Sequence, residues 1–226
     1  MKPLPPGQRA RADFPRFGLN PYAPRFPKVV DRIELSIAGQ VATPVTVSQE
    51  LESLPRVEQT SDFHCVTTWS CRELRWSGFR FRDFYEQIVL PRAQPDARAR
   101  ALALRCQDGY RACLLLEDLL AEDVLLADRL DDAPLSIEHG APLRLIAPAH
   151  YGYKSAKHLS AFEFLLDPSG HRTAALKLME HPRARVALEE RGRGVPGVLL
   201  RYLYRPLISM TVRRFARTME KFRGLA

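Results

Sequence analysis

The chain has 226 residues, of which 46% are hydrophobic and 27% charged, and its formal net charge at pH 7 is +8. This hydrophobic content excludes a generally disordered chain, and the length suits one domain with extensions. Lys and Arg can neutralise phosphates, but no zinc-finger spacing, aromatic RNA-binding motif or helix-turn-helix pattern accompanies them, so no nucleic-acid partner is expected.

The first residues, "MKPLPPGQRARADFPRF", have neither the apolar core of a signal peptide nor a twin arginine. No uninterrupted apolar run approaches the length of a membrane span. We therefore expect a cytoplasmic protein whose four cysteines, at positions 65, 71, 106 and 113, are reduced thiols.

The first elements are an arm and a strand. Residues 1–28 are rich in Pro and Arg and predict an extended arm. The alternation of Ile33, Leu35 and Ile37 then predicts a strand that ends at Gly39.

Short helices and strands are expected to follow. Ser48 is a candidate cap for a short helix over "QELESLP", and "FRDFYEQIVLP" has helical spacing, with Pro91 expected to end the helix. "ALALRC" and "YRACLLL" flank the turn signal "QDG" and predict a hairpin. "LEDLLAEDVLLADRLDDAPL" predicts a helical turn and a buried strand, and "APLRLIAP" and "SAFEFLLD" each predict one more strand. These elements indicate an α+β domain of mixed sheets and short helices over residues 29–167.

Residues 168–226 form a basic extension with an amphipathic helix, which Pro206 is expected to break or kink. One helical face carries Ile208, Val212, Phe215, Met219 and Phe222. The opposing charge comes from Arg201, Arg205, Arg213, Arg214, Arg217 and Lys221. Such a helix either packs back on its own domain or lies on an anionic membrane surface or a partner. We favour packing, since any surface helix is amphipathic.

One cysteine stands out in "DFHCVTTWSCRELRWSGFRF", residues 62–81. Taken alone, Cys65 is most often a small buried hydrophobe in such a context. A zinc site with His64 and Cys71 has unsuitable spacing, and a Cys nucleophile needs a base that local sequence cannot show.

A second stretch, "HGAPLRLIAPAHYGYKSAKHL" from His139 to Leu159, brings together Lys154, Ser155 and Lys157 beside Gly152. Ammonium groups, a hydroxyl and backbone N–H groups in one loop are typical of a phosphate site. A solvated turn is the alternative.

Together the two stretches, in this order, resemble the molybdopterin-binding domain of the sulfite oxidase family, over roughly residues 12–166. The similarity is greatest to small bacterial members related to the catalytic subunit of methionine sulfoxide reductase. It implies a sulfite-oxidase-type molybdopterin-binding fold and a molybdenum–molybdopterin cofactor, with the mononucleotide form favoured.

The resemblance also implies the roles of particular residues. Cys65 matches the thiolate that binds molybdenum, a soft electron-donating ligand. The residues that match positions around the cofactor's phosphate and pterin are His139, Arg144, Ser155, Ala156 and Lys157, with Asn20 and Tyr22 of the arm and Cys106 as further candidates. Trp69 belongs to the signature or simply packs beneath the site.

Three positions depart from the family pattern or have no family role. His139 stands where the methionine sulfoxide reductase branch has asparagine. His64 either faces the substrate as a catalytic residue or braces the loop. Cys71 has no family role.

The sequence thus predicts an oxidoreductase that catalyses oxygen-atom transfer or a related two-electron reaction on a small substrate such as an S-oxide, an N-oxide or sulfite. Electrons are expected to pass to or from an external redox partner, a membrane or heme protein among the candidates. The C-terminal helix is a candidate docking surface for that partner or for peripheral contact with a membrane. Two other classes remain open: a non-catalytic module that binds a cofactor or phosphate ligand, and an interaction protein that acts on nucleic acid through its basic tail.

Overall fold

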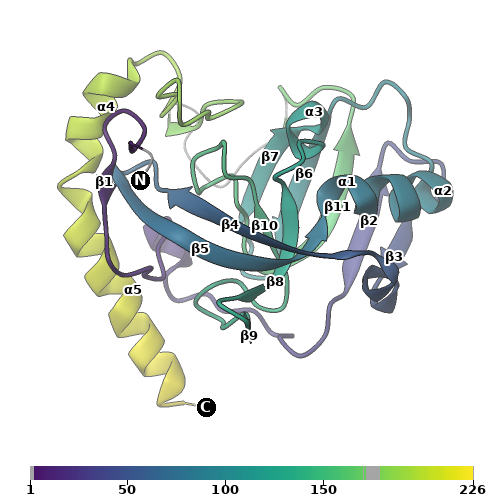
Figure 1. Cartoon of the computed structure of the whole chain (residues 1–226), viewed down its shortest axis with the longest axis horizontal. Helices are drawn as coiled ribbons and strands as arrows, with labels where there is room; N and C mark the ends of the chain where they lie inside the picture. The colour runs from purple at the N-terminus through teal and green to yellow at the C-terminus, as the bar shows by residue number, and fades with distance from the viewer. Residues whose placement is uncertain (1–2, 170, 172–178, 226) are drawn as a thin grey trace.

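The computed structural model describes residues 3–169, 171 and 179–225. Two β-sheets with short helices at their ends form the body, and two C-terminal helices run along one side (Figure 1). The predicted α+β fold of mixed sheets and short helices is confirmed. Part of the expected extension, residues 170 and 172–178, lies outside the described residues.

The first sheet is built on the long antiparallel pair β4 and β5, whose connection carries Cys65. Its strands are β1 (Arg9–Ala10), β4 (Arg56–His64), β5 (Trp69–Arg80), β8 (Leu125–Leu130), β9 (Ala133–Pro134) and β10 (Arg144–Ile146). The arm strand β1 runs parallel to β5, pairing Arg9 with Trp69, so the N-terminal arm lies directly beside the Cys65 turn.

The second sheet has the order β3-β2-β11-β6-β7. Its strands are β2 (Leu35–Gly39), β3 (Val45–Val47), β6 (Ala101–Cys106), β7 (Arg111–Leu115) and β11 (Leu159–Leu165). The predicted hairpin is the antiparallel pair β6 and β7. Strand β11 leads directly out of the second sequence stretch, so the loop around Lys157 is held at the end of a central strand.

The short helices are η1 (Asn20–Tyr22), η2 (Gln49–Ser53), α1 (Phe81–Phe84), η3 (Tyr85–Val89), α2 (Leu90–Ala93) and α3 (Leu116–Leu119). Two details of the predicted helices were wrong. Ser48 does not cap η2 through its side chain, because its hydroxyl donates to the carbonyl of Ile33 at 2.7 Å. Pro91 does not end its helix: α1, η3 and α2 follow one another without a break, and η3, the π-helical turn directly before Pro91, lets the helix accommodate a residue without an N–H.

The main core lies on the second sheet. Phe81 and Phe84 pack edge-on or tilted against Phe162 of β11, with ring centroids 5.6 Å and 5.9 Å from it, and all three are fully buried. These aromatic contacts fix α1 against β11 and therefore the strand that positions the Lys157 loop.

The C-terminal helices α4 (Gly197–Tyr204) and α5 (Leu207–Arg223) are separated at Pro206, as predicted. They lie along the side of the molecule where the N-terminal arm runs (Figure 1). The ring of Phe215 stacks on Phe17 at 6.5 Å and that of Phe222 on Phe26 at 4.0 Å. The apolar face of α5 thus packs on the chain's own arm, which is the interpretation that the sequence favoured.

Two of the six basic residues predicted to lie opposite the apolar face form contacts within the chain. Arg201 pairs with Glu189 at 2.6 Å, and the Nε of Arg205 donates to the hydroxyl of Thr68 at 3.5 Å. The exposed cations of the outer face therefore begin only at Arg213. Among the residues that the structure describes, no helix combines the length and apolarity needed to cross a bilayer.

We expect Phe162→Ala to lower the free energy of unfolding by about 3–5 kcal/mol, because it leaves a cavity between α1 and β11. Urea unfolding followed by circular dichroism measures this loss. The control is Leu166→Ala on the same segment, where the side chain is 36% exposed and the loss should stay below about 1 kcal/mol. Equal losses in both variants would contradict this account of the core.

Candidate functional site

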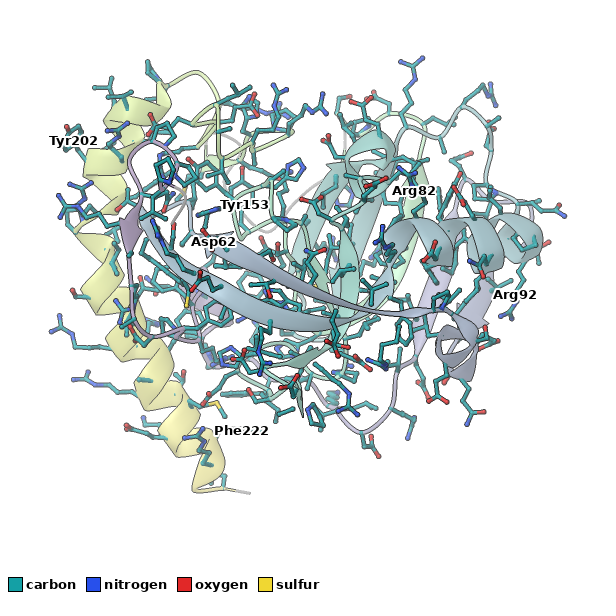
Figure 2. All side chains as sticks on the ribbon, viewed as in Figure 1. Asp62, Arg82, Arg92, Tyr153, Tyr202 and Phe222 are labelled. Atoms are coloured by element: carbon teal, nitrogen blue, oxygen red, sulfur yellow. The ribbon has the colours of Figure 1, made fainter. Side chains whose placement is uncertain are left out.

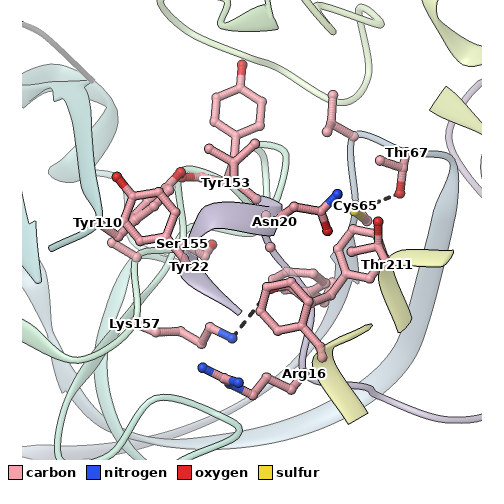
Figure 3. A pocket seen from close by; sticks show the side chains of 18 of the residues that line it. Arg16, Asn20, Tyr22, Cys65, Thr67, Tyr110, Tyr153, Ser155, Lys157 and Thr211 are labelled. Carbon is pink, nitrogen blue, oxygen red and sulfur yellow. Dashed lines mark hydrogen bonds between the residues drawn. The ribbon is translucent and has the colours of Figure 1, made fainter. Parts of the chain in front are cut away.

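A cavity of about 240 Å³ lies between the two sheets' loops, the N-terminal arm and the C-terminal helices. It connects the two stretches singled out in the sequence, since its lining includes Cys65 at one place and Ser155, Ala156 and Lys157 at another. In Figure 3, Cys65 and Thr67 lie on one side of the view and Lys157 and Arg16 on the other. The arm residues Asn20 and Tyr22 also line it.

Cys65 sits in a tight turn between β4 and β5. Its N–H donates to the carbonyl of Trp69 at 2.8 Å, and its own carbonyl accepts from the N–H of Thr68 at 3.1 Å. Thr68 has φ of 84°, a left-handed conformation that is costly for a β-branched residue. The turn therefore holds the thiol in one place at the expense of local strain. The Sγ lies 3.1 Å from the Thr67 hydroxyl, and burial raises the pKa of the thiol.

A polar network braces this turn from behind. The amide of Gln8 donates to the carbonyl of Cys65 at 3.1 Å and accepts from the hydroxyl of Ser70 at 3.0 Å. The Nδ1 of His64 lies 2.8 Å from the same hydroxyl. His64 is buried and is not among the cavity's lining residues, so its position here is that of a brace for the turn.

A second brace comes from the C-terminal segment. Arg191 is fully buried, donates to the carbonyls of Val66 and Pro6, and pairs with Glu189 at 3.2 Å. Its guanidinium also lies over the ring of Tyr151 at 4.8 Å. One side chain thus ties the Cys65 turn, the arm and the C-terminal segment together.

At the other end, the two lysines of the second stretch point in different directions. Lys157 lines the cavity and donates to the carbonyls of Glu138 at 3.2 Å and Phe17 at 3.5 Å. Lys154 is buried elsewhere, where it donates to the carbonyl of Cys113 at 2.6 Å and pairs with Glu180 at 3.3 Å. Of the two lysines grouped from the sequence, only Lys157 faces the cavity.

The cavity end near Lys157 is strongly cationic. Lys157 and Arg16 line it, and Arg144 is buried behind Ser155, to whose carbonyl it donates at 3.4 Å. In the described part of the chain all three cations hydrogen-bond to backbone carbonyls, with no carboxylate ion pair. Burial lowers the pKa of Arg144 to about 9, and burial with repulsion from Arg144 and Arg16 lowers the pKa of Lys157 to about 7.

Two buried polar atoms around this end have no partner, namely the side-chain oxygen of Asn20 and the Nε of Arg144. Buried cations and unpaired polar atoms are costly unless a ligand satisfies them. One acid lines the same end: Asp108, whose pKa is raised by burial and which attracts Lys157 and Arg16 electrostatically. The arrangement suits an extended ligand with an anionic group near Lys157 and polar groups near Asn20.

Three further predicted residues lie behind the cavity wall instead of on it. Arg144 donates to the carbonyl of His139 at 2.7 Å, and the His139 ring stacks on Phe14 at 4.9 Å. Cys106 is packed in the main core at the end of β6, and burial raises the pKa of its thiol well above its ordinary value. Trp69 does line the cavity, wedged against Phe14, Phe17 and Phe63.

The sequence analysis missed a large part of the lining. Arg16 of the arm, together with Asp108 and Tyr110 of the β6–β7 turn, belongs to it, as do residues of the C-terminal segment: Met179, Tyr204, Leu207, Thr211 and Phe215. No linear motif marks these positions, because they reach the cavity through folding of the arm and of α4 and α5. Only the "QDG" turn signal pointed to the neighbourhood of Asp108.

Known proteins similar to this chain identify its family. A family model described as "Oxidoreductase molybdopterin binding domain" matches residues 23–172. The chain belongs to this family. It is a molybdopterin-dependent oxidoreductase of the sulfite oxidase type, and the family recognised from the two sequence stretches is confirmed.

Individual relatives support the assignment to different extents. An uncharacterised oxidoreductase of Bacillus subtilis, YuiH, is 35% identical over 71% of this chain and 78% of its own length. The catalytic subunit MsrP of the protein-methionine-sulfoxide reductase of Campylobacter jejuni is 29% identical over 58% of this chain and 48% of its own. The sulfane dehydrogenase SoxCD of Paracoccus pantotrophus has the same fold, with a TM-score of 0.53, 20% identity and coverage of 67% of this chain and 43% of its own.

The residues present fit a molybdopterin. The family's cofactor needs a soft donor for its metal and an anion site for its phosphate. Cys65 supplies a sulfur on one cavity wall, and the unpaired cations near Lys157 supply the anion site. Gly140 has φ of 116°, and a Cβ there would lie 3.1 Å from both Lys157 and Arg144, so this glycine lets the loop close over the two cations.

We expect Lys157→Met to change how the stability of cofactor-free protein depends on pH. The pKa of Lys157 falls from 10.5 to about 7 on folding, so its burial cost is complete below pH 7 and disappears as the pH rises towards 10.5. The variant should therefore exceed the wild type in stability most at pH 6 to 7, and the difference should shrink at higher pH. Urea unfolding across this range measures it, with Lys221→Met, an exposed position, as control. Parallel curves for wild type and Lys157→Met would contradict the assignment.

Removal of the second brace should loosen the Cys65 turn. Arg191→Met leaves the carbonyls of Val66 and Pro6 without their buried donor, while Glu189 keeps its pair with Arg201, so the loss of stability should be about 1–3 kcal/mol. Hydrogen exchange should rise at Val66–Thr68 before it rises in β4 and β5. Arg193→Met, at an exposed neighbouring position, is the matched control. Unchanged exchange at the turn would show that Arg191 does not hold it.

Proposed function

We propose that this chain catalyses oxygen-atom transfer, or a related two-electron reaction, on a small S-oxide, N-oxide or sulfite-like substrate. The supporting observation is the single cavity that connects the Cys65 thiol to the cationic loop end at Lys157. The thiol suits a metal that prefers sulfur ligands, and the cations near Lys157 suit a phosphate. One extended ligand that carries both groups would occupy both ends of the cavity. The similarity to MsrP, a methionine-sulfoxide reductase subunit by name, supports an S-oxide among the substrates.

In this proposal Cys65 binds the metal as a thiolate. The free thiol has a raised pKa, so the proton leaves only when a cation is present to stabilise the sulfur anion. The strained turn and its two braces keep the Sγ facing the cavity, which lowers the reorganisation needed for binding. The molybdenum cofactor, when bound, supplies a metal whose oxidation state changes by two electrons, and the protein supplies its position and surroundings.

The opposite end binds the phosphate of the cofactor. Lys157 and Arg16 provide charge on the cavity surface, and Ser155 and Ala156 bring the backbone close. We assign Arg144 to a supporting role, since it holds the carbonyls of His139 and Ser155 from behind and adds positive potential. An anion bound here would hold Lys157 in its charged form.

The pterin is proposed to lie between these ends. Asn20, whose side-chain oxygen is buried without a partner, and Tyr22, which packs edge-on against Tyr110 at 5.5 Å, face it from the arm. Cys106 and His139 then shape the wall from behind. The plain mononucleotide form stays our preference, as predicted from the resemblance.

The substrate is expected to approach the Cys65 end. There the walls are Val66, Thr67, Tyr204 and Thr211, which offer hydroxyls and apolar surface instead of charged groups. His64 is assigned to bracing the turn, and a catalytic role for it stays a prediction. No nucleic acid is required for this chemistry.

Electrons must be exchanged with an external redox partner, and a membrane or heme protein remains the expected kind. We assign the surface of α4 and α5 to this exchange. The cytoplasmic location stays a prediction.

The cofactor assignment is tested by measuring molybdenum and pterin separately in purified protein. Cys65→Ser should remove one molybdenum–sulfur bond, counted by X-ray absorption spectroscopy, while pterin is retained, because the sulfurs of the pterin itself also hold the metal. Lys157→Met should lose both, because the anion site is removed. Cys113→Ser is the matched control: this thiol is buried, does not line the cavity, and has a pKa of about 11.

The same number of molybdenum–sulfur bonds in Cys65→Ser as in the wild type would overturn the ligand assignment. A wild-type protein that contains neither molybdenum nor pterin after maturation in a cofactor-producing host would favour the alternative, a non-catalytic module that binds another phosphate ligand.

A further inference from the structure

The exposed apolar surface of this protein is concentrated in one place. Among the described residues, twelve large hydrophobic side chains are exposed, and eight of them fall between positions 188 and 210. Six of the eight belong to α4 and the first turn of α5: Val198, Leu199, Tyr202, Leu203, Leu207 and Met210. Tyr202 and Leu203 are 62% and 65% exposed. Figure 2 shows Tyr202 on the outer side of α4, away from the body of the molecule.

These residues form a continuous stripe along the outer face of the two helices. Leu199, Leu203, Leu207 and Met210 follow one another at intervals of three or four residues, which places them on one side. The same spacing continues through Arg214, Arg217 and Lys221, which are also exposed. The outer face is therefore apolar in its first half and cationic in its second.

This face is distinct from the one that packs on the domain. Leu200, Tyr204, Phe215 and Met219 are the buried side chains that attach the helices to the arm and the cavity. Apart from Leu207, which also lines the cavity, the described residues of the outer stripe are not among the buried side chains that attach the helices, and exposing so many large apolar side chains together is unfavourable without a partner.

The charge around the stripe indicates what kind of partner fits. Residues 191–226 contain nine Arg or Lys side chains and one acid, Glu220. In the described part of the chain, Arg214, Arg217 and Lys221 take part in no ion pair with a carboxylate, in contrast to Arg201 and Arg223. Aliphatic side chains with an adjacent row of unpaired cations are typical of helices that lie in the interface of an anionic bilayer.

We propose that the outer stripe of α4 and α5 binds the surface of an anionic phospholipid bilayer. Leu199, Leu203 and Met210 enter the boundary between headgroups and acyl chains, while Arg214, Arg217 and Lys221 contact lipid phosphates. Because Leu207 is both 40% exposed and part of the cavity lining, the bilayer lies against one wall of the site. Lipid binding by the outer stripe requires no cofactor. Only its link to electron exchange rests on the proposed function.

The test is sedimentation of the purified, molybdenum-quantified protein with vesicles. We expect binding to vesicles of phosphatidylcholine with about one quarter phosphatidylglycerol, weak binding to pure phosphatidylcholine, and weakening as salt rises above about 0.1 M. Leu199→Asp/Leu203→Asp should reduce binding at least about tenfold, because two side chains can no longer enter the interface. Arg214→Gln/Arg217→Gln should reduce binding to anionic vesicles at least about tenfold and weaken its salt dependence, since of the three proposed phosphate contacts only Lys221 is left.

The matched control is Leu90→Asp, which changes a leucine that is also 40% exposed but lies on α2, at the opposite end of the molecule (Figure 1). It should bind as the wild type does. Molybdenum content and circular dichroism are measured on every variant, so that loss of the cofactor or of the fold is separated from loss of lipid binding.

Three results would overturn the proposal. The first is no sedimentation of wild-type protein with anionic vesicles, and the second is binding that ignores both lipid charge and salt. The third is a dimer in light scattering that Leu199→Asp/Leu203→Asp dissociates, which would make the stripe an interface between two copies of the chain.

Discussion

The structure depends on three buried cations that form no direct ion pair with a carboxylate of the described residues and have Asp108 as an electrostatic neighbour. Lys157, Arg16 and Arg144 meet at one end of a cavity and bond to backbone carbonyls, among the residues described. The cost of that arrangement appears in the lowered pKa of each group. An anionic ligand would offset much of the free energy lost in burying these cations, so ligand binding should stabilise the folded domain. The glycine at position 140 and the core around Phe162 matter because they bring the cationic loop to this place.

At the other end of the cavity, hydrogen bonds and a strained turn, not buried charge, fix the position of the Cys65 thiol. Cys65 is presented by a strained turn and braced by a network from Gln8 to His64 and by Arg191. Its surroundings favour the neutral thiol, as expected for a sulfur that becomes an anion only when it binds a cation. The braces come from the first residues and from the C-terminal segment, so the chain's two extremities converge on this one turn.

The C-terminal helices belong to the site and not only to the surface. The family model ends at residue 172, yet Tyr204, Leu207, Thr211 and Phe215 line the cavity. Deleting the segment would therefore open the cavity as well as remove the outer stripe, and point substitutions on the outer face are the cleaner way to separate the two roles. One face of these helices packs on the domain, and the opposite face carries the exposed outer stripe. Their sequence is therefore apolar on more than one side.

The sequence by itself determined the family, the α+β fold, the hairpin and the break at Pro206, because each depends on local pattern or on a short motif. It also singled out Cys65 and Lys157, which the structure brings to one cavity. It could not separate Lys154 from Lys157, since both lie in one loop and only packing sends one to Glu180 and the other to the cavity. It also could not show that Arg201 pairs with Glu189 or that Arg16 lines the cavity. These contacts join residues from separate segments, and no linear spacing encodes them. Only the tertiary structure decided these contacts, because a buried charged side chain pairs with whichever polar group the fold places within hydrogen-bonding distance.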